Sequence, residues 1–456
     1  MKHRAFLWAL LVMLLVGVFD MTRSISGPLM QKTFSLSYGE LGILFAASSI
    51  GYLIGSSTVG WGLNHVEVKF GVLIGGLITM LGLVLAASAS YFYIALAGFA
   101  LSGVGSGWME VSVNALIPVL SALKERTNSG PNAVDLANSE QPGEQPGEQA
   151  GMFNILHGFY GVGAFAFPVT ATWLIARLGG WRPLFTILAG LLLVVLIGIF
   201  GTRFPKTRQR HVEETNVADT VLAAASFPEN SGIVPIKDMS SASEGHTRPP
   251  RSNRLKRTKQ TGKSRQEGLQ FSFALAGLLV AITAYVMAEV GVGAWLPTYL
   301  VHGRHLSLSH SSFYLSGFYA TFTIGRLLGH LWVSRFGHHR AILWSTIFAF
   351  ALVVVGELRT DWTFAFVLAG AGFAVIFPTI TAIASETFPN HSGKVLGLLF
   401  TSAGIGSMVI SWLIGGMASW FGLDVAFILI PVCLAASLIG LWMSRIPPQG
   451  LYMEVE

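Results

Sequence analysis

Charged residues are scarce in this chain. They make up 11% of its 456 residues, whereas an ordinary soluble protein has about 25%. Hydrophobic residues make up 52%, there are 52 glycines, and the mean hydropathy is +0.60. This composition excludes a water-soluble globular protein, a disordered chain and a nucleic-acid-binding module. It favours a protein that uses lipid as its solvent.

Cysteine and excess positive charge are also missing from most of the chain. Cys433 is the single cysteine and lies in a hydrophobic run, so an intrachain disulfide cannot form. Lys and Arg number 29 against 23 Asp and Glu, but residues 202–270 alone hold 13 basic and 7 acidic residues. The rest of the chain, with 16 of each, is neutral. The high pI therefore describes one loop and does not indicate a DNA-binding surface.

Long apolar runs predict transmembrane helices. A helix needs about 20 apolar residues to cross the hydrocarbon core of a bilayer. The runs are continuously apolar and do not alternate with period two, which argues against a β-barrel. The first run follows Lys2 and Arg4 without a small-residue cleavage site, so we interpret it as a retained first span. Twelve spans are predicted, at about 5–30, 39–63, 70–88, 91–121, 151–176, 183–201, 270–300, 312–333, 341–357, 362–385, 394–418 and 424–444.

Basic residues in the short loops predict the orientation. With the N-terminus in the cytoplasm, the inside ends and loops carry nine Lys or Arg and the outside loops carry five, leaving out the long central loop. We therefore expect both termini in the cytoplasm of a multi-pass protein of the plasma or inner membrane. Two polar segments lie outside the spans: an insert at about 124–150 and a basic linker at 204–269, predicted to be disordered. They divide the chain into halves at 1–203 and 270–456.

The two halves resemble each other in sequence. Gly161 and Gly163 in the fifth span parallel Gly404 and Gly406 in the eleventh. Further matches link the turns after these spans, and the fourth span to the tenth. The matches occur in the same order in both halves. The number of residues between matched positions falls across the polar insert, as an extra loop in the first half requires. We therefore predict an all-α membrane protein of twelve helices in two pseudo-symmetric six-helix halves, the major facilitator fold.

Charged side chains within the spans are the main candidates for a site, because a charge at mid-bilayer costs several kcal/mol. Asp20 and Arg23 are spaced i, i+3 and can pair, either as a tuned proton carrier or as a structural ion pair. Glu110 and Asn114 are spaced i, i+4 in the fourth span. They face the same way and could hold a polyol or a proton, or only join helices.

The remaining candidates lie in the fifth, seventh and eighth spans. Polar residues at the start of the fifth span could bind a hydroxyl or carry a proton. Alternatively, they could be core residues whose hydrogen bonds are satisfied within the protein. An acidic and aromatic group in the seventh could contact a sugar ring, or serve packing. Basic residues of the eighth span and its following loop could gate the cytoplasmic side, or anchor it. These candidates are Asn154 and His157; Tyr285, Glu289 and Trp295; and Arg326, Arg335 and Arg340.

Several motifs resemble one group of transporters. The chain is similar to the major facilitator superfamily throughout, and more narrowly to the fucose–galactose–glucose:proton symporters related to the L-fucose permease. The resemblance implies that the span-4 carboxylate, Glu110, takes part in proton coupling. The family's span-1 Asp falls at Ser24, and the Asp of this chain, Asp20, lies one turn earlier. The motifs that carry the resemblance are GWMEVSVN at 107–114, NILH at 154–157, YVMAEV at 285–290, IGR at 324–326 with SRF at 334–336, and FPTI at 377–380.

Together these patterns predict a secondary active transporter. We expect it to carry a sugar or similar polyhydroxy solute by alternating access in proton symport. Its expected partners are the solute, protons and the lipid bilayer. A proton-antiport exporter of drugs or metabolites on the same fold is the alternative, and a sensor or channel ranks below both. No nucleophile–base group, metal-ligand spacing or phosphate loop indicates an enzyme, a cofactor or a metal. The resemblance implies a monomer, and the location of the basic excess in one loop gives no reason to expect a nucleic-acid partner.

Overall fold

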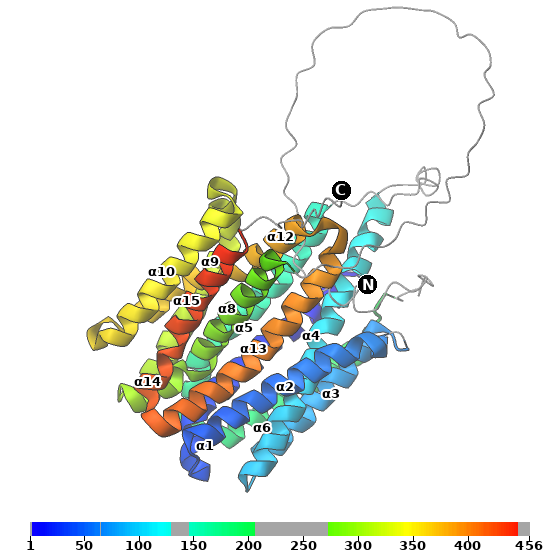
Figure 1. The fold of residues 1–456 in the computed structure, drawn as a ribbon. Helices are drawn as coiled ribbons and strands as arrows, with labels where there is room; N and C mark the ends of the chain where they lie inside the picture. Colours follow the sequence, from blue (N-terminus) through cyan, green and yellow to red (C-terminus); the bar gives the residue numbers. More distant parts are fainter. Residues whose placement is uncertain (1, 64, 129–145, 206–271, 446–456) are drawn as a thin grey trace, which may run out of the picture.

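The computed structural model describes residues 2–63, 65–128, 146–205 and 272–445, and within these all regular structure is helical (Figure 1). Six helices form the N-terminal half because each apolar run is long enough to satisfy its backbone groups inside the bilayer. They are α1 (Lys2–Phe34), α2 (Tyr38–Leu63), α3 (Val68–Ala87), α4 (Phe92–Asn128), α5 (Pro146–Leu178) and α6 (Trp181–Gly201).

The C-terminal half repeats this pattern with more interruptions. Three of its six spans are broken into two pieces, and short 3₁₀ turns η4 (Thr360–Trp362) and η5 (Pro389–His391) precede the tenth and eleventh spans. Span seven is α8 (Phe273–Thr298) with the π-helix η3 (Tyr299–Gly303). The others are α9 (Leu308–Phe336), α10 (His338–Leu358), α11 (Ala365–Phe373) with α12 (Ile376–Thr387), α13 (Ser392–Phe421), and α14 (Leu423–Phe427) with α15 (Leu429–Met443).

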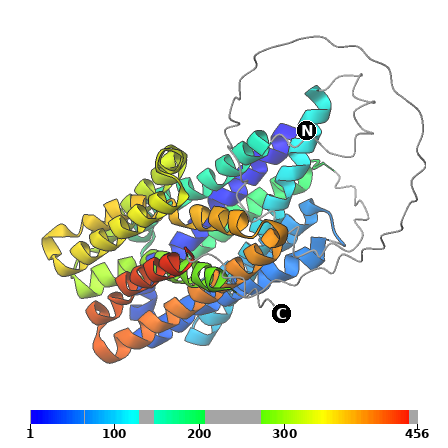
Figure 2. The same cartoon turned by 45° about the horizontal axis from the view of Figure 1, so that its top comes forward.

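Twelve helical spans, six in each half, agree with the sequence-based prediction. By length and apolarity, eleven spans of the described chain qualify as membrane-crossing. The twelfth, α9, is long enough, but its serines, histidines and Arg326 make it more polar. The bundle has two ends (Figures 1 and 2): the near face, where α1 begins, and the far face, where α1 ends.

The helices on either side of the polar insert are longer than the spans themselves. The segment at 124–150 was predicted to lie outside the spans, and within it α4 continues to Asn128 while α5 begins at Pro146. The helices extend beyond their apolar stretches because a helix, once started, adds residues at little cost. Residues 129–145 and most of the predicted linker, 206–271, lie outside the described part of the chain.

Glycines at matching places in the two halves carry the closest helix contacts. Gly103 of α4 faces the backbone of α2, and Gly105 faces α3. In the second half Gly370 of α11 faces α9 in the same way, and Gly372 faces α10. A Cβ atom at any of the four would lie less than 3 Å from a neighbouring backbone atom. The sequence repeat therefore corresponds to a repeated packing arrangement.

The fifth span of each half follows the same rule. Gly163 of α5 packs against the backbone of α1, and Gly406 of α13 packs against α8. Small residues let membrane helices approach closely enough for extensive van der Waals contact. These two contacts fix the first and fifth spans of each half against each other, and the polar residues of α1 and α5 are thereby placed side by side.

We expect Gly105→Ala to lower the free energy of unfolding by about 1–3 kcal/mol, because the added methyl group would force α4 away from α3. A Cβ at Gly105 would lie 2.3 Å from the Thr79 amide nitrogen. The control is Gly190→Ala on α6, where nothing lies within 4 Å and the helix should gain up to about 1 kcal/mol. Thermal unfolding in detergent compares the two variants, and equal melting temperatures would contradict the packing argument.

Candidate functional site

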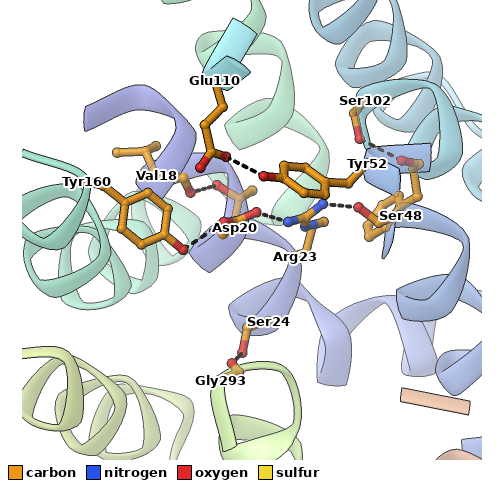
Figure 3. Close-up of polar contacts among 12 residues, drawn as sticks. Val18, Asp20, Arg23, Ser24, Ser48, Tyr52, Ser102, Glu110, Tyr160 and Gly293 are labelled. Atoms are coloured by element: carbon orange, nitrogen blue, oxygen red, sulfur yellow. Dashed lines mark hydrogen bonds and ion pairs between the residues drawn. The ribbon is translucent and has the colours of Figure 1, made fainter. Parts of the chain in front are cut away.

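Four helices of the N-terminal half bring polar side chains together inside the bundle. Figure 3 shows Asp20 and Arg23 of α1, Tyr52 of α2, Glu110 of α4 and Tyr160 of α5 pointing toward one another. The glycine contacts between α1 and α5, and between α2 and α4, make this convergence possible because they allow the helices to pack closely.

Asp20 and Arg23 form an ion pair, as their i, i+3 spacing allows. The second carboxylate oxygen of Asp20 accepts a hydrogen bond from the Tyr160 hydroxyl at 2.8 Å. The Arg23 guanidinium also donates to the Ser48 hydroxyl on α2. The side chains of Asp20 and Arg23 are 28% and 21% exposed. The pair therefore neutralises itself within the protein and is held in place from two other helices.

Glu110 has a different environment. Its carboxylate accepts a hydrogen bond from the Tyr52 hydroxyl at 3.0 Å, and among the described residues it takes part in no salt bridge. One turn further along α4, Asn114 is 3% exposed, and its side-chain oxygen has no hydrogen-bond partner within the described chain. A carboxylate without a cation is costly in the membrane interior. Glu110 is therefore suited to bind a proton.

A second polar group lies in the C-terminal half. The Tyr285 hydroxyl of α8 donates to the Phe373 carbonyl at 2.9 Å and lies within hydrogen-bonding reach of Glu289 and Arg326. The Arg326 guanidinium lies over the Phe322 ring, 4.4 Å from its centroid. These contacts place Arg326 with the residues of α8, deep within its span.

Tyrosines connect the groups of the two halves. Tyr319 of α9 is close enough to interact electrostatically with Arg23, Glu289 and Arg326. Tyr160 of α5 likewise interacts with Glu289 and Tyr319 across the boundary between the halves. We refer to the seven residues as the polar cluster: Asp20, Arg23, Glu110, Tyr160, Glu289, Tyr319 and Arg326.

The other predicted site residues are packed beside the polar cluster or lie at the near face. Tyr285 and Trp295 are 0% exposed, and the Trp295 ring packs edge-on against Phe45. In this state both belong to the packed interior. Arg335 and Arg340 are exposed at the near face, and Arg335 follows Arg326 by nine positions, about 13 Å along the helix.

Two further candidates lie on α5. His157 is half-buried and electrostatically coupled to Arg326 of the other half. It therefore borders the polar cluster on the side of α9. Asn154 lies one turn before His157 on the same helix, but its side chain is outside the described part of the structure.

Comparison with known proteins settles the family. The sequence profile of the Major Facilitator Superfamily matches residues 8–356. The chain belongs to this superfamily. It is therefore an integral membrane protein of a transporter family, and its twelve-span fold is that of the superfamily.

The individual proteins that this superfamily member resembles have low sequence identity to it. Bypass of stop codon protein 6 of Saccharomyces cerevisiae is 22% identical over 438 residues, 91% of this chain and 77% of that protein. The crystal structure of the E. coli fucose:proton symporter matches 96% of this chain and 98% of its own, with 18% identity and a TM-score of 0.56. An inward-facing, unoccupied bacterial homolog of the human lysosomal transporter Spinster matches 97% of each chain, with 13% identity and a TM-score of 0.70. At these identities the structures establish the fold alone.

The two halves of this major facilitator protein are joined at the far face. The Gly39 amide of α2 donates to the Ser419 hydroxyl of α13 at 2.7 Å, and Gly42 packs directly against Gly415 on the same helix pair. Between α5 and α9, Thr172 is hydrogen-bonded to a serine near the start of α9. The described state is therefore one in which helices of opposite halves are in contact at the far face.

Several residues of the polar cluster and its surroundings were missed by the sequence reasoning. Tyr52, Ser48, Tyr160 and Tyr319 are uncharged, and such residues are common in membrane helices. Tyr160 lies three positions after His157, on nearly the same helical face, and this spacing was the one signal that could have indicated it. The other three can be recognised only by their partners.

We expect Tyr52→Phe to lower the free energy of unfolding by about 1.5 kcal/mol. The Tyr52 hydroxyl donates to the Glu110 carboxylate, and a hydrogen bond to a charged group contributes about 1.5–3 kcal/mol. Thermal unfolding in detergent measures the change. Tyr314→Phe on α9, outside the polar cluster, is the control, and an unchanged melting temperature of Tyr52→Phe would contradict a structural role of this hydrogen bond.

Proposed function

We propose that the protein is a proton-coupled symporter of a sugar or related polyhydroxy solute and works by alternating access. The observation that carries the proposal is the contrast between two carboxylates in one cluster. Asp20 is neutralised by Arg23, whereas Glu110 is bonded to the neutral hydroxyl of Tyr52. Of these two, Glu110 is the one whose charge changes most readily during transport.

Protonation of Glu110 provides a physical reason for coupling. With Glu110 ionised, the site holds an uncompensated charge that resists enclosure in a low-dielectric interior. Binding of one proton removes that charge, so that the loaded carrier can close around its solute. The two halves then rock against each other, and the contacts at the far face break while the solute moves between the two faces.

The composition of the polar cluster supports a hydroxyl-rich solute. Its tyrosine hydroxyls and the two ion-paired groups offer both donors and acceptors. Beside the cluster, one turn from Glu110, the unpartnered amide oxygen of Asn114 offers a further acceptor. The fold likeness to a fucose:proton symporter fits this proposal. The alternative, proton antiport of a drug or metabolite, would use the same Glu110 but would prefer an apolar site. That preference weighs against it here.

The test is electrogenic current from proteoliposomes that hold the purified protein. A panel of hexoses, deoxyhexoses and disaccharides would be added at several pH values. We expect a saturable, sugar-specific inward current that grows as the external pH falls. If no sugar evokes a current or is exchanged in counterflow, the sugar assignment is wrong. Proton efflux driven by amphipathic drugs would then support the antiport alternative.

The membrane orientation and the oligomeric state belong to the same proposal. We propose that the near face is cytoplasmic, that the protein lies in the plasma or inner membrane, and that it acts as a monomer. Arg335 and Arg340, both exposed at the near face, would then follow the positive-inside rule. In sealed cell-membrane vesicles of known sidedness, their accessibility to a membrane-impermeant arginine reagent from one side only would decide the orientation.

A further inference from the structure

The first spans of the two halves each contain a proline near the far face. Pro28 lies within α1 and Pro297 within α8. A proline has no amide hydrogen, so the carbonyl four residues before it loses its helical partner. In α8 this carbonyl belongs to Gly293, and in α1 it belongs to Ser24. In a membrane interior an unpaired carbonyl must find another donor.

For Gly293 that donor comes from the opposite half of the protein. The Ser24 hydroxyl of α1 donates to the Gly293 carbonyl oxygen at 2.6 Å and lies 3.2 Å from the Ala294 carbonyl (Figure 3). Ser24 is 1% exposed, so this bond is shielded from water. The bond joins the two halves between the polar cluster and the far face. It gives the Gly293 carbonyl the hydrogen-bond donor that Pro297 cannot supply.

Small residues allow α1 and α8 to meet at this point. A Cβ atom at Gly293 would lie 2.4 Å from the Tyr319 hydroxyl, and one at Gly27 would lie 3.3 Å from the Thr298 hydroxyl. The Thr298 hydroxyl is itself buried without a hydrogen-bond partner in the described chain. The two helices are therefore in close contact at this point, and the Ser24 hydroxyl supplies a hydrogen bond between them.

We propose that the Gly293 carbonyl is a shared acceptor, bound by Ser24 when the far face is closed and by a hydroxyl of the transported solute when it opens. The bond to Ser24 must break when α1 and α8 separate, and it leaves behind an exposed carbonyl next to Tyr319 and the polar cluster. A hydroxyl-bearing solute that enters from the far face restores the missing hydrogen bond. This inference rests on the proposed function for the identity of the solute, but the bond to Ser24 can be tested without it.

A double-mutant cycle tests the bond. In a Cys433→Ser background, Ser312→Cys places a thiol at a fully buried position of α9 that lies against α5 of the other half. A membrane-impermeant maleimide added from the far side then reports opening of that face. Ser24→Ala should raise the labelling rate about five- to tenfold. Pro297→Ala returns an amide hydrogen to the Gly293 carbonyl, and in that background Ser24→Ala should change the rate less than about twofold.

Controls separate the bond from general packing. Ser26→Ala removes a buried hydroxyl of the same helix that has no hydrogen-bond partner in the described chain, and it should leave the rate unchanged. Pro297→Gly also supplies an amide hydrogen and replaces Pro297→Ala if a straightened α8 prevents folding. Equal effects of Ser24→Ala with and without Pro297, or no effect in either, would overturn the proposal.

Transport kinetics with L-fucose and D-xylose test the acceptor role. Pro297→Ala should raise KM for uptake from the far side about five- to tenfold. In this variant the Gly293 carbonyl accepts from the amide of residue 297 and no longer needs a hydroxyl of the solute. Ser24→Ala should lower KM, because the open state is populated more often. Shifts in the same direction would reject a shared acceptor. If wild type responds to neither sugar nor to the wider panel, the proposed function and the acceptor role both fail, while the labelling cycle still decides the bond to Ser24.

Discussion

Glu110→Gln should reduce solute accumulation from about 50-fold to no accumulation at all. A proton crossing a potential of about 100 mV releases about 2.3 kcal/mol, enough to support a gradient of about 50-fold for a solute carried with it. Glutamine resembles the protonated carboxyl in shape and charge but cannot release a proton. The variant should therefore bind and exchange the solute while ignoring the proton gradient.

Two assays on the same proteoliposomes separate the outcomes. Accumulation driven by an imposed potential should disappear, and counterflow, which needs only exchange across the bilayer, should remain within a few-fold of wild type. Glu40→Gln is the control, since Glu40 is a carboxylate of the exposed α2 end that bonds to Ser37. Full gradient-driven accumulation by Glu110→Gln would remove the proposed proton site. Loss of both accumulation and exchange would assign Glu110 to solute binding or folding.

Asp20→Asn should destabilise the protein by about 1–3 kcal/mol. Removing one member of a fully buried ion pair costs about 3–5 kcal/mol, and the cost is smaller here because the side chains of Asp20 and Arg23 are 28% and 21% exposed. Arg23 would keep its charge in the membrane interior, where its guanidinium donates to the Ser48 hydroxyl of α2. The Tyr160 hydroxyl would also lose the charged acceptor to which it donates. We expect a large fall in the monodisperse fraction after solubilisation and a lower melting temperature in detergent.

The double variant Asp20→Asn/Arg23→Gln gives the matched control. Removing both charges together leaves no unpaired ion, and such neutral replacements are often close to wild type in stability. Stability should therefore largely return. If the double variant also accumulates solute against a gradient, Asp20 does not carry the transported proton, and Glu110 is left as the carrier. If Asp20→Asn alone is as stable as wild type, the ion pair has no structural role.

Local chemistry explains what the sequence predicts well. Span lengths follow from bilayer thickness, so the twelve helices could be located within a few residues, except where α4 and α5 continue into the polar insert. The i, i+3 spacing of Asp20 and Arg23 depends only on helix geometry, and the pair forms as that spacing allows. A similar argument singled out Glu110 as a candidate site residue, because it required only the cost of burying a carboxylate in the membrane.

The sequence by itself determined the number and class of the spans, the repeat of the two halves and the carboxylates that must be accommodated in the membrane. Tertiary structure decided which side chains meet them: Tyr52 at Glu110, Tyr160 at Asp20 and Ser24 at the Gly293 carbonyl, 269 residues away. The reason is physical. Local periodicity fixes which face of a helix a residue occupies, but the rotation and neighbours of that helix depend on close packing at glycines throughout the bundle.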